Sequence, residues 1–285
     1  MLKNCILILM IVFITFSCKN KSDWGKASVG HDSLGYWEAV LENEQIRVRY
    51  GFGMGEEEPE SFIREAVLKT HSEINIAGGI LDGAAHRGLL TRAEIIKDSD
   101  IEKSIYLEWA SVPSMKDHFP GPASCEISIF KDSPVLKVRY ISFCFSHVCD
   151  IGLEKTDTLD ANWGGITRVY GFDRDTLPQY EDCLYWREYG FVGCEGVHAA
   201  NGIEGDPAPL SYNGWMIMGV YNPANNVGFG RVVPAETIRA IKLLWNKGFE
   251  LFPTNKEYTG YIYFFDNGED GVLSSGKSIV DNLKK

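Results

Sequence analysis

The chain has 285 residues, of which 45% are hydrophobic and 24% charged, an ordinary composition for a globular protein. This length suffices for one large domain or two closely joined β-halves. With 39 acidic and 28 basic residues, the formal net charge is −11, which argues against nucleic acid as a partner. An acidic sugar stays compatible with this charge, because a binding site responds mainly to the few charges that line it.

The first residues predict export and lipidation. Residues 1–17 combine Lys3 with an apolar run over 6–16 that is too short for a comfortable membrane span, which is typical of a signal peptide. Ser17, Cys18 and the polar stretch KNKSD resemble the lipobox of bacterial lipoproteins, which implies an acylated Cys18 and a lipidated tether over 18–34. We therefore expect an outer-membrane lipoprotein, periplasmic or at the cell surface. The alternative is an ordinary cleaved signal.

Alternating apolar and polar residues predict antiparallel strands along most of the chain. In QIRVRYG, residues 45–51, the side chains of Ile46, Val48 and Tyr50 share one face, while two arginines occupy the other. The same reading predicts strands over 104–111, 124–130, 135–143, 214–221, 226–233 and 258–266. Turn-forming residues separate these segments.

Helix signals are few. Residues 56–71, EEEPESFIREAVLKTH, fit either a helix that follows an acidic start or a strand. Residues 269–285 have a helical spacing of apolar side chains and a cationic end, so we expect a short C-terminal helix that packs on a sheet edge. The chain is thus predicted to be all-β, a large antiparallel β-sandwich over residues 35–285 in one domain, with a jelly roll as the alternative.

Several segments resemble galactose-mutarotase-like proteins. They are YWEAVLENEQIRVRYG, IFKDSPVLKVRYISF, GFGRVVPAETIRAIKLLW and YTGYIYFFDNGEDGVLSSGKSIVDNL. The resemblance implies the super-sandwich fold of that group, whose His and Glu pair has no counterpart that can be placed here residue by residue. The combination of signal, anchor, sandwich and aromatic-rich cleft also resembles lipoprotein polysaccharide lyases and oligosaccharide dehydratases that act on uronic-acid glycans.

The segment YWREYGFVGCEGVH, residues 185–198, gathers the side chains that β-elimination from a uronate needs. A base removes the proton beside the carboxylate, a cation neutralises that carboxylate, and an acid protonates the leaving oxygen. If residues 183–189 form one strand, alternation places Tyr185, Arg187 and Tyr189 on one face. The candidate catalytic residues are His198, Tyr189, Arg187 and His147. The candidate substrate-binding residues are Tyr185, Trp186, Asn162, Trp163, Arg168 and Glu195.

Other interpretations stay open. Each candidate is otherwise an ordinary polar residue of a strand or loop, and the function is alternatively that of an aldose epimerase, a glycosidase or a non-catalytic glycan-binding lipoprotein. No metal or cofactor is expected, although Cys144, His147 and Cys149 could hold zinc and the acidic turns 51–60 and 266–271 could hold structural calcium. The spacing of the cysteines settles no disulfide, and the sequence leaves the oligomeric state open.

Overall fold

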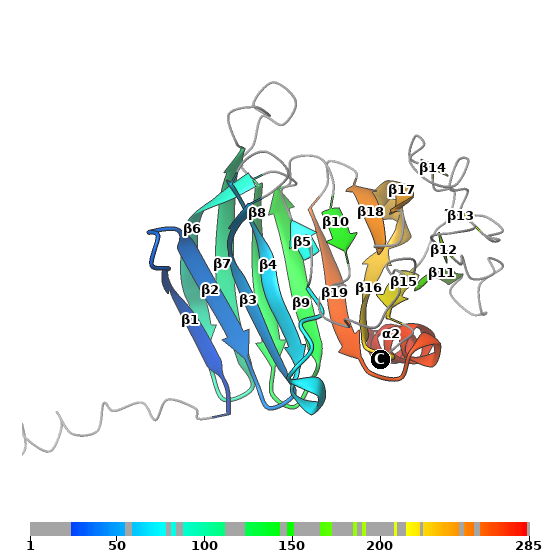
Figure 1. The fold of residues 1–285 in the computed structure, drawn as a ribbon, viewed down its shortest axis with the longest axis horizontal. Coiled ribbons are helices and arrows are strands. Elements are labelled where there is room, and N and C mark those ends of the chain that lie inside the picture. Colours follow the sequence, from blue (N-terminus) through cyan, green and yellow to red (C-terminus); the bar gives the residue numbers. More distant parts are fainter. Residues whose placement is uncertain are drawn as a thin grey trace, which may run out of the picture.

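The computed structural model describes residues 24–54, 59–77, 81–83, 88–111, 123–142, 147–150, 166–172, 185–186, 190–191, 208–209, 215–222, 225–244, 248–253 and 257–283. Their strands form two antiparallel sheets that face each other (Figure 1). The nine-stranded sheet has the order β1 (Lys26–His31), β2 (Trp37–Glu42), β3 (Ile46–Met54), β4 (Pro59–Leu68), β5 (Leu81–Gly83), β10 (His147–Asp150), β18 (Gly248–Pro253), β17 (Ile238–Leu244) and β14 (Ala208–Pro209).

The ten-stranded sheet lies behind it in Figure 1. Its order is β13 (Gly190–Phe191), β12 (Tyr185–Trp186), β11 (Ile166–Phe172), β15 (Trp215–Tyr221), β16 (Gly228–Pro234), β19 (Tyr258–Phe265), β9 (Val135–Ser142), β8 (Ala123–Phe130), β7 (Glu102–Ser111) and β6 (Gly88–Asp98). Two short 3₁₀ turns, η1 (Lys69–His71) and η3 (Ala235–Thr237), follow β4 and β16.

One apolar core fills the space between the sheets. Leu41 and Val48 enter it from the nine-stranded sheet, and Leu107 and Val138 enter it from the ten-stranded sheet, each at most 1% exposed. Because alternate residues of a strand point to the same face, each strand buries one set of apolar side chains in this core. The predicted antiparallel β-sandwich is confirmed.

The helix α2 (Glu269–Leu283) covers part of the outer face of the ten-stranded sheet (Figure 1). Val272 and Val280 of α2 pack with Ile217, Val232 and Tyr263 in a second apolar cluster. The C-terminal helix is therefore confirmed, but its predicted place on a sheet edge is wrong. It lies across β15, β16 and β19, because those strands are apolar on both faces and their outer face must also be buried.

All seven strands predicted from alternation are present, with ends that differ by three residues or fewer. The helical interpretation of 56–71 is wrong, because residues 59–68 form β4. A bulge causes the ambiguity: Arg49 pairs with Glu65 and Tyr50 pairs with Ile63, which leaves Arg64 as an extra residue in β4. The extra residue breaks the two-residue period and produces a spacing that imitates a helix.

The folded region begins earlier than predicted. The strand β1 lies within the segment 18–34 that was expected to be a tether, and it pairs with β2 along its whole length. Just before β1, the Trp24 ring is nearly buried in the core, and its Nε1 donates to the Ser99 carbonyl at 2.9 Å. Among the described residues, no helix is both long enough and apolar enough to span a membrane.

Candidate functional site

The structure describes only some of the candidate residues that were predicted from the sequence. The following candidates lie outside the described residues: Cys18, Asn162, Trp163, Arg187, Tyr189, Glu195 and His198. For His147, Arg168, Tyr185 and Trp186 the structure describes the strand position and its pairing. Their proposed roles therefore stay predictions. Cys144, in the alternative zinc site, is also outside the described residues.

The pairing separates these four positions into two groups. Arg168 of β11 lies opposite Gly219, and its neighbour Thr167 lies opposite Tyr185 of β12, so Arg168 and Tyr185 occupy adjacent strands of the ten-stranded sheet. His147 lies in the other sheet, opposite Leu251 of β18.

Tyr185 and Trp186 form the short strand β12, which pairs antiparallel with β13. Trp186 lies opposite Gly190, and Tyr185 lies opposite Phe191. The other residues of the predicted strand over 183–189 lie outside the described residues, so the alternation expected there stays a prediction.

A buried cluster of two tyrosines and one arginine lies on the inner face of the ten-stranded sheet. Tyr140 of β9 and Tyr258 of β19 are cross-strand partners, and their rings stack with centroids 4.7 Å apart. Arg231 of β16 reaches the same place: its Nη2 donates to the Tyr140 hydroxyl, and its guanidinium carbon lies 5.4 Å from the centre of the Tyr140 ring. Tyr140 and Arg231 are each 1% exposed.

The surroundings of β16 explain why Arg231 is buried. The core covers one face of this strand and α2 covers the other, so every residue from Gly228 to Val233 is buried. A side chain at position 231 has no route to solvent, and a guanidinium stays charged even there. Sequence reasoning missed Arg231, although a signal was present: a single cation inside the apolar run GFGRVV.

This Arg231–Tyr140–Tyr258 cluster has a recognisable chemical capacity. A permanent positive charge in a low-dielectric interior attracts an anionic group strongly, and a phenol can donate or accept a proton. The cluster also lies near the point where the chain changes sheets, because β9 ends at Ser142 and β10 begins with His147. In this structure the cluster is closed to solvent.

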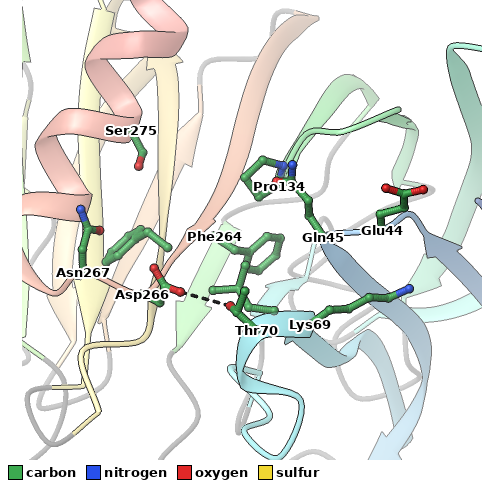
Figure 2. Close-up of a pocket in the computed structure, with 11 residues that line it drawn as sticks. Glu44, Gln45, Lys69, Thr70, Pro134, Phe264, Asp266, Asn267 and Ser275 are labelled. Carbon is green, nitrogen blue, oxygen red and sulfur yellow. Dashed lines mark hydrogen bonds between the residues drawn. The ribbon is translucent and has the colours of Figure 1, made fainter.

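A pocket of about 530 Å³ with a mixed apolar and polar lining lies between η1 and the start of α2 (Figure 2). Its lining includes Lys69 and Thr70 of η1, together with Asp266, Asn267 and Ser275 around the start of α2. Thr70 Oγ1 donates to Asp266 Oδ2 at 3.1 Å, the contact that is dashed in Figure 2. The pocket thus offers hydroxyl, amide, ammonium and carboxylate groups.

Neither end of the described fold contains a metal centre. Within the ranges that the structure describes, no three His, Cys, Asp or Glu side chains gather closely enough to hold an ion. In the turn 266–271, Asp266 instead accepts from Thr70 and lies 3.4 Å from His71 Nε2, while Glu269 and Asp270 form the first turn of α2. The side chain of Cys125 is buried in the core, where Cys125 lies opposite Tyr140.

No protein-family model matches the chain, and no curated protein matches it. Similar solved structures include the ligand-free alpha-N-acetylgalactosaminidase NagBb from Bifidobacterium bifidum, with 9% identity, a TM-score of 0.45, and coverage of 90% of this chain and 38% of that one. The GH36 alpha-galactosidase AgaB from Geobacillus stearothermophilus has 6% identity and a TM-score of 0.41, with 86% of this chain and 42% of that one covered.

A third similar structure is a galactose mutarotase related enzyme from Lactobacillus acidophilus, with 9% identity, a TM-score of 0.34, and coverage of 81% of this chain and 98% of that one. All three names are those of carbohydrate-active enzymes, and the third belongs to the group that the sequence resembles. This chain spans less than half the length of the first two. At these identities and TM-scores, the likenesses assign neither a family nor an activity to it.

Proposed function

We propose that the chain is a carbohydrate-active enzyme that acts on uronic-acid oligosaccharides by β-elimination. The observation that supports this proposal is the Arg231–Tyr140–Tyr258 cluster, because elimination from a uronate needs both a cation and a proton-transferring group. Arg231 neutralises the sugar carboxylate, and Tyr140 takes part in proton transfer. Because the cluster is closed, substrate entry requires this end of the sandwich to open.

In the proposed reaction, a base removes the proton from C5 of the uronate while the guanidinium stabilises the charge that develops on the carboxylate. The electron pair forms the C4–C5 double bond, the C4–O bond breaks, and an acid protonates the leaving oxygen. His198 and Tyr189 are further candidates for the base and the acid, Arg187 for a second cation, and Trp163 or Trp186 for stacking on the sugar ring.

The direct test is to incubate the purified protein with a panel of uronic-acid oligosaccharides and to follow the ultraviolet absorbance of the unsaturated product. We expect activity in the wild type and a loss of about 100-fold or more in Tyr140→Phe, the usual size of an acid–base contribution. Tyr221→Phe is the matched control. It removes a hydroxyl group that lies outside the cluster and donates a hydrogen bond to Glu269 Oε2 of α2 at 3.3 Å.

Three outcomes contradict parts of the proposal. New reducing ends without unsaturation would indicate a glycosidase, and interconversion of sugar anomers or epimers would indicate an epimerase. No reaction on any glycan, with binding retained, would indicate a binding lipoprotein. Equal activity in Tyr140→Phe and Tyr221→Phe would exclude the buried cluster as the reaction site.

We also propose that Cys18 carries a lipid and anchors the protein to the outer membrane. The supporting observation is the sequence itself, in which Ser17 and Cys18 follow the apolar run over 6–16 and precede a polar stretch. We expect the full-length chain to be found in the membrane fraction of a bacterial host and Cys18→Ser to be released from it. An unchanged membrane fraction for Cys18→Ser would contradict lipidation.

A further inference from the structure

The outer face of the ten-stranded sheet carries an ordered row of polar side chains beside α2. The row crosses five strands at successive register positions: Lys97 of β6 lies opposite Ser104, Ser104 opposite Ser128, Ser128 opposite Lys137, and Lys137 opposite Tyr261. Neighbouring strands are about 4.8 Å apart, so these five residues extend over roughly 19 Å. These five residues form a transverse row across the sheet.

A shallow groove of about 240 Å³ follows the row over β6 to β19. Its charged lining consists of three cations, Lys97, Lys137 and Arg139, and two carboxylates, Glu102 and Glu126. The hydroxyls of Ser104 and Ser128 lie 2.8 Å apart on its floor, and Thr259 adds a third hydroxyl. Three of the chain's 28 basic residues thus line one groove, although the net charge of the chain is −11.

Lys137 is the cation of this groove that we consider for binding a ligand. Lys97 pairs with Glu102, and Arg139 pairs with Glu126 at 3.2 Å and with Glu257 at 2.6 Å. Among the described residues, no carboxylate pairs with Lys137. An ammonium group without a carboxylate partner can bind an anionic ligand without first breaking an existing ion pair.

Two aromatic side chains, Tyr261 and Trp215, lie at the end of the transverse row that is nearest α2. The rings of Tyr261 and Trp215 have centroids 6.4 Å apart, and both side chains are only partly buried against α2. Tyr261 lies directly opposite Lys137, so an aromatic surface and the Lys137 ammonium group are neighbours. Aromatic rings of this kind offer a flat surface for the apolar face of a sugar ring.

We propose that the transverse row binds an anionic polysaccharide on the outer face of the sheet, separately from the reaction site between the sheets. Tyr261 and Trp215 contact a sugar ring, Lys137 binds the anionic group of that sugar or of its neighbour, and the serine hydroxyls bond to sugar oxygens. For the class of ligand, an acidic glycan, this inference rests on the proposed function. The anion is a carboxylate or a sulfate ester, which share the same charge and the same acceptor oxygens.

The test measures polymer binding by affinity electrophoresis and calorimetry, with polygalacturonate as the carboxylate probe, dextran sulfate as the sulfate probe and dextran as the uncharged probe. We expect binding to at least one anionic probe, weak or no binding to dextran, and weakening by added salt. Lys137→Gln should reduce the affinity by about tenfold or more, the size of a charge-assisted hydrogen bond.

Lys277→Gln is the matched control, because it removes the same charge from an exposed position on α2 and should leave the affinity within about twofold of the wild type. Equal affinities of Lys137→Gln and the wild type would overturn the proposal, as would equal binding of dextran or no binding of any polymer. Polymer binding without any elimination activity would contradict the proposed function alone. Elimination activity with unchanged binding in Lys137→Gln would contradict the transverse row alone.

Discussion

Gly230 shows how tightly a single residue can be constrained in this fold. A Cβ at position 230 would lie 2.1 Å from Cζ of Tyr263, whose hydroxyl donates to the Val272 carbonyl of α2 at 2.6 Å. The tyrosine ring cannot move without breaking that bond. A glycine at this position therefore allows β16 and β19 to pack under the helix.

We predict that Gly230→Ala lowers the free energy of unfolding by about 2 kcal/mol or more, because the added methyl group overpacks a closed site. Gly30→Ala is the control, since a Cβ there would meet nothing within 4 Å. Urea denaturation of both variants measures the difference. Equal stability of the two variants would mean that Tyr263 has room to move.

The lowered pKa of Glu102, which lines the groove, predicts that the stability of the protein depends on pH. Burial alone would raise the pKa of Glu102, but hydrogen bonds from Lys97, Ser128 and Ser104 outweigh burial and hold the pKa below its ordinary value of 4.5. The ionised carboxylate is thus favoured in the folded state. Its contribution to stability is present above the unfolded-state pKa and is lost as the pH falls through the lower folded-state pKa.

We therefore expect the stability of the wild type to fall more steeply than that of Glu102→Gln as the pH decreases from about 5 to 3. Urea midpoints measured across this range would test the difference. Parallel curves for the two proteins would show that the groove contributes nothing to acid stability.

At the residue scale, the sequence predicted the inward positions of single strands well. Ile46, Val48 and Tyr50 are all buried, as their alternation with two arginines indicated. It failed at Arg231, because alternation cannot indicate that a second layer, α2, covers the outer face of β16. The transverse row was missed for another reason: its members come from five separate strands, and their alignment depends on register.

The helix α2 packs on the sheet through its apolar face. Val280 is 1% exposed in the cluster beneath α2, while its neighbour Asp281 is exposed. Trp215 packs at the edge of the same cluster and therefore reports on whether the helix is docked.

We predict that Val280→Asp costs about 3 kcal/mol or more, because it places an unpaired charge against the sheet. Undocking of α2 should also shift the tryptophan emission to longer wavelength as Trp215 becomes hydrated. Asp281→Asn should change stability by about 0.5 kcal/mol or less. Identical denaturation curves for the two variants would contradict a docked helix.

At the element scale, the seven strands with clear alternation were predictable, but strand β4 was not. Its bulge places the apolar residues 62, 63, 66 and 67 at a spacing that suits a helix face, although all four are buried in a strand. The C-terminal helix was recognisable from its own period. Its place on the sheet was not, because that depends on which strands remain apolar on both faces.

The side chain of Asn43 joins the two sheets by hydrogen bonds at the end of the sandwich where β2 turns into β3. Asn43, 1% exposed, donates through Nδ2 to the carbonyls of Phe130 and Ser133, each at 2.8 Å. Its Oδ1 accepts from the amides of Gln45 and Ile46, also at 2.8 Å. The β2–β3 turn of one sheet is thereby fixed to the β8–β9 turn of the other.

We predict that Asn43→Ala destabilises the whole molecule by about 3 kcal/mol, because it leaves polar backbone groups unsatisfied in both sheets. Gln45→Ala removes one exposed hydrogen bond to the Asp132 carbonyl and should cost about 0.5 kcal/mol or less. Thermal denaturation of both variants tests the difference, and equal midpoints would show that Asn43 does not join the sheets.

At the scale of the whole molecule, composition and alternation indicated a sandwich, yet they could not supply the strand order. The pairing of β19 with β9 and the return of β10 to the first sheet depend on contacts between distant parts of the chain. The same limit applies to the candidate sites, since Tyr140, Tyr258 and Arg231 meet only after three separated strands have paired.

The position of β19 in the ten-stranded sheet affects how the protein folds during synthesis. Arg139 and Glu257 are 118 positions apart in the chain, yet they bond across neighbouring strands in the middle of the ten-stranded sheet. During synthesis, β9 has an open edge until β19, its neighbour on that side, has been made. We expect such long-range pairing to slow folding and to leave the nascent chain prone to aggregation until β19 pairs with β9.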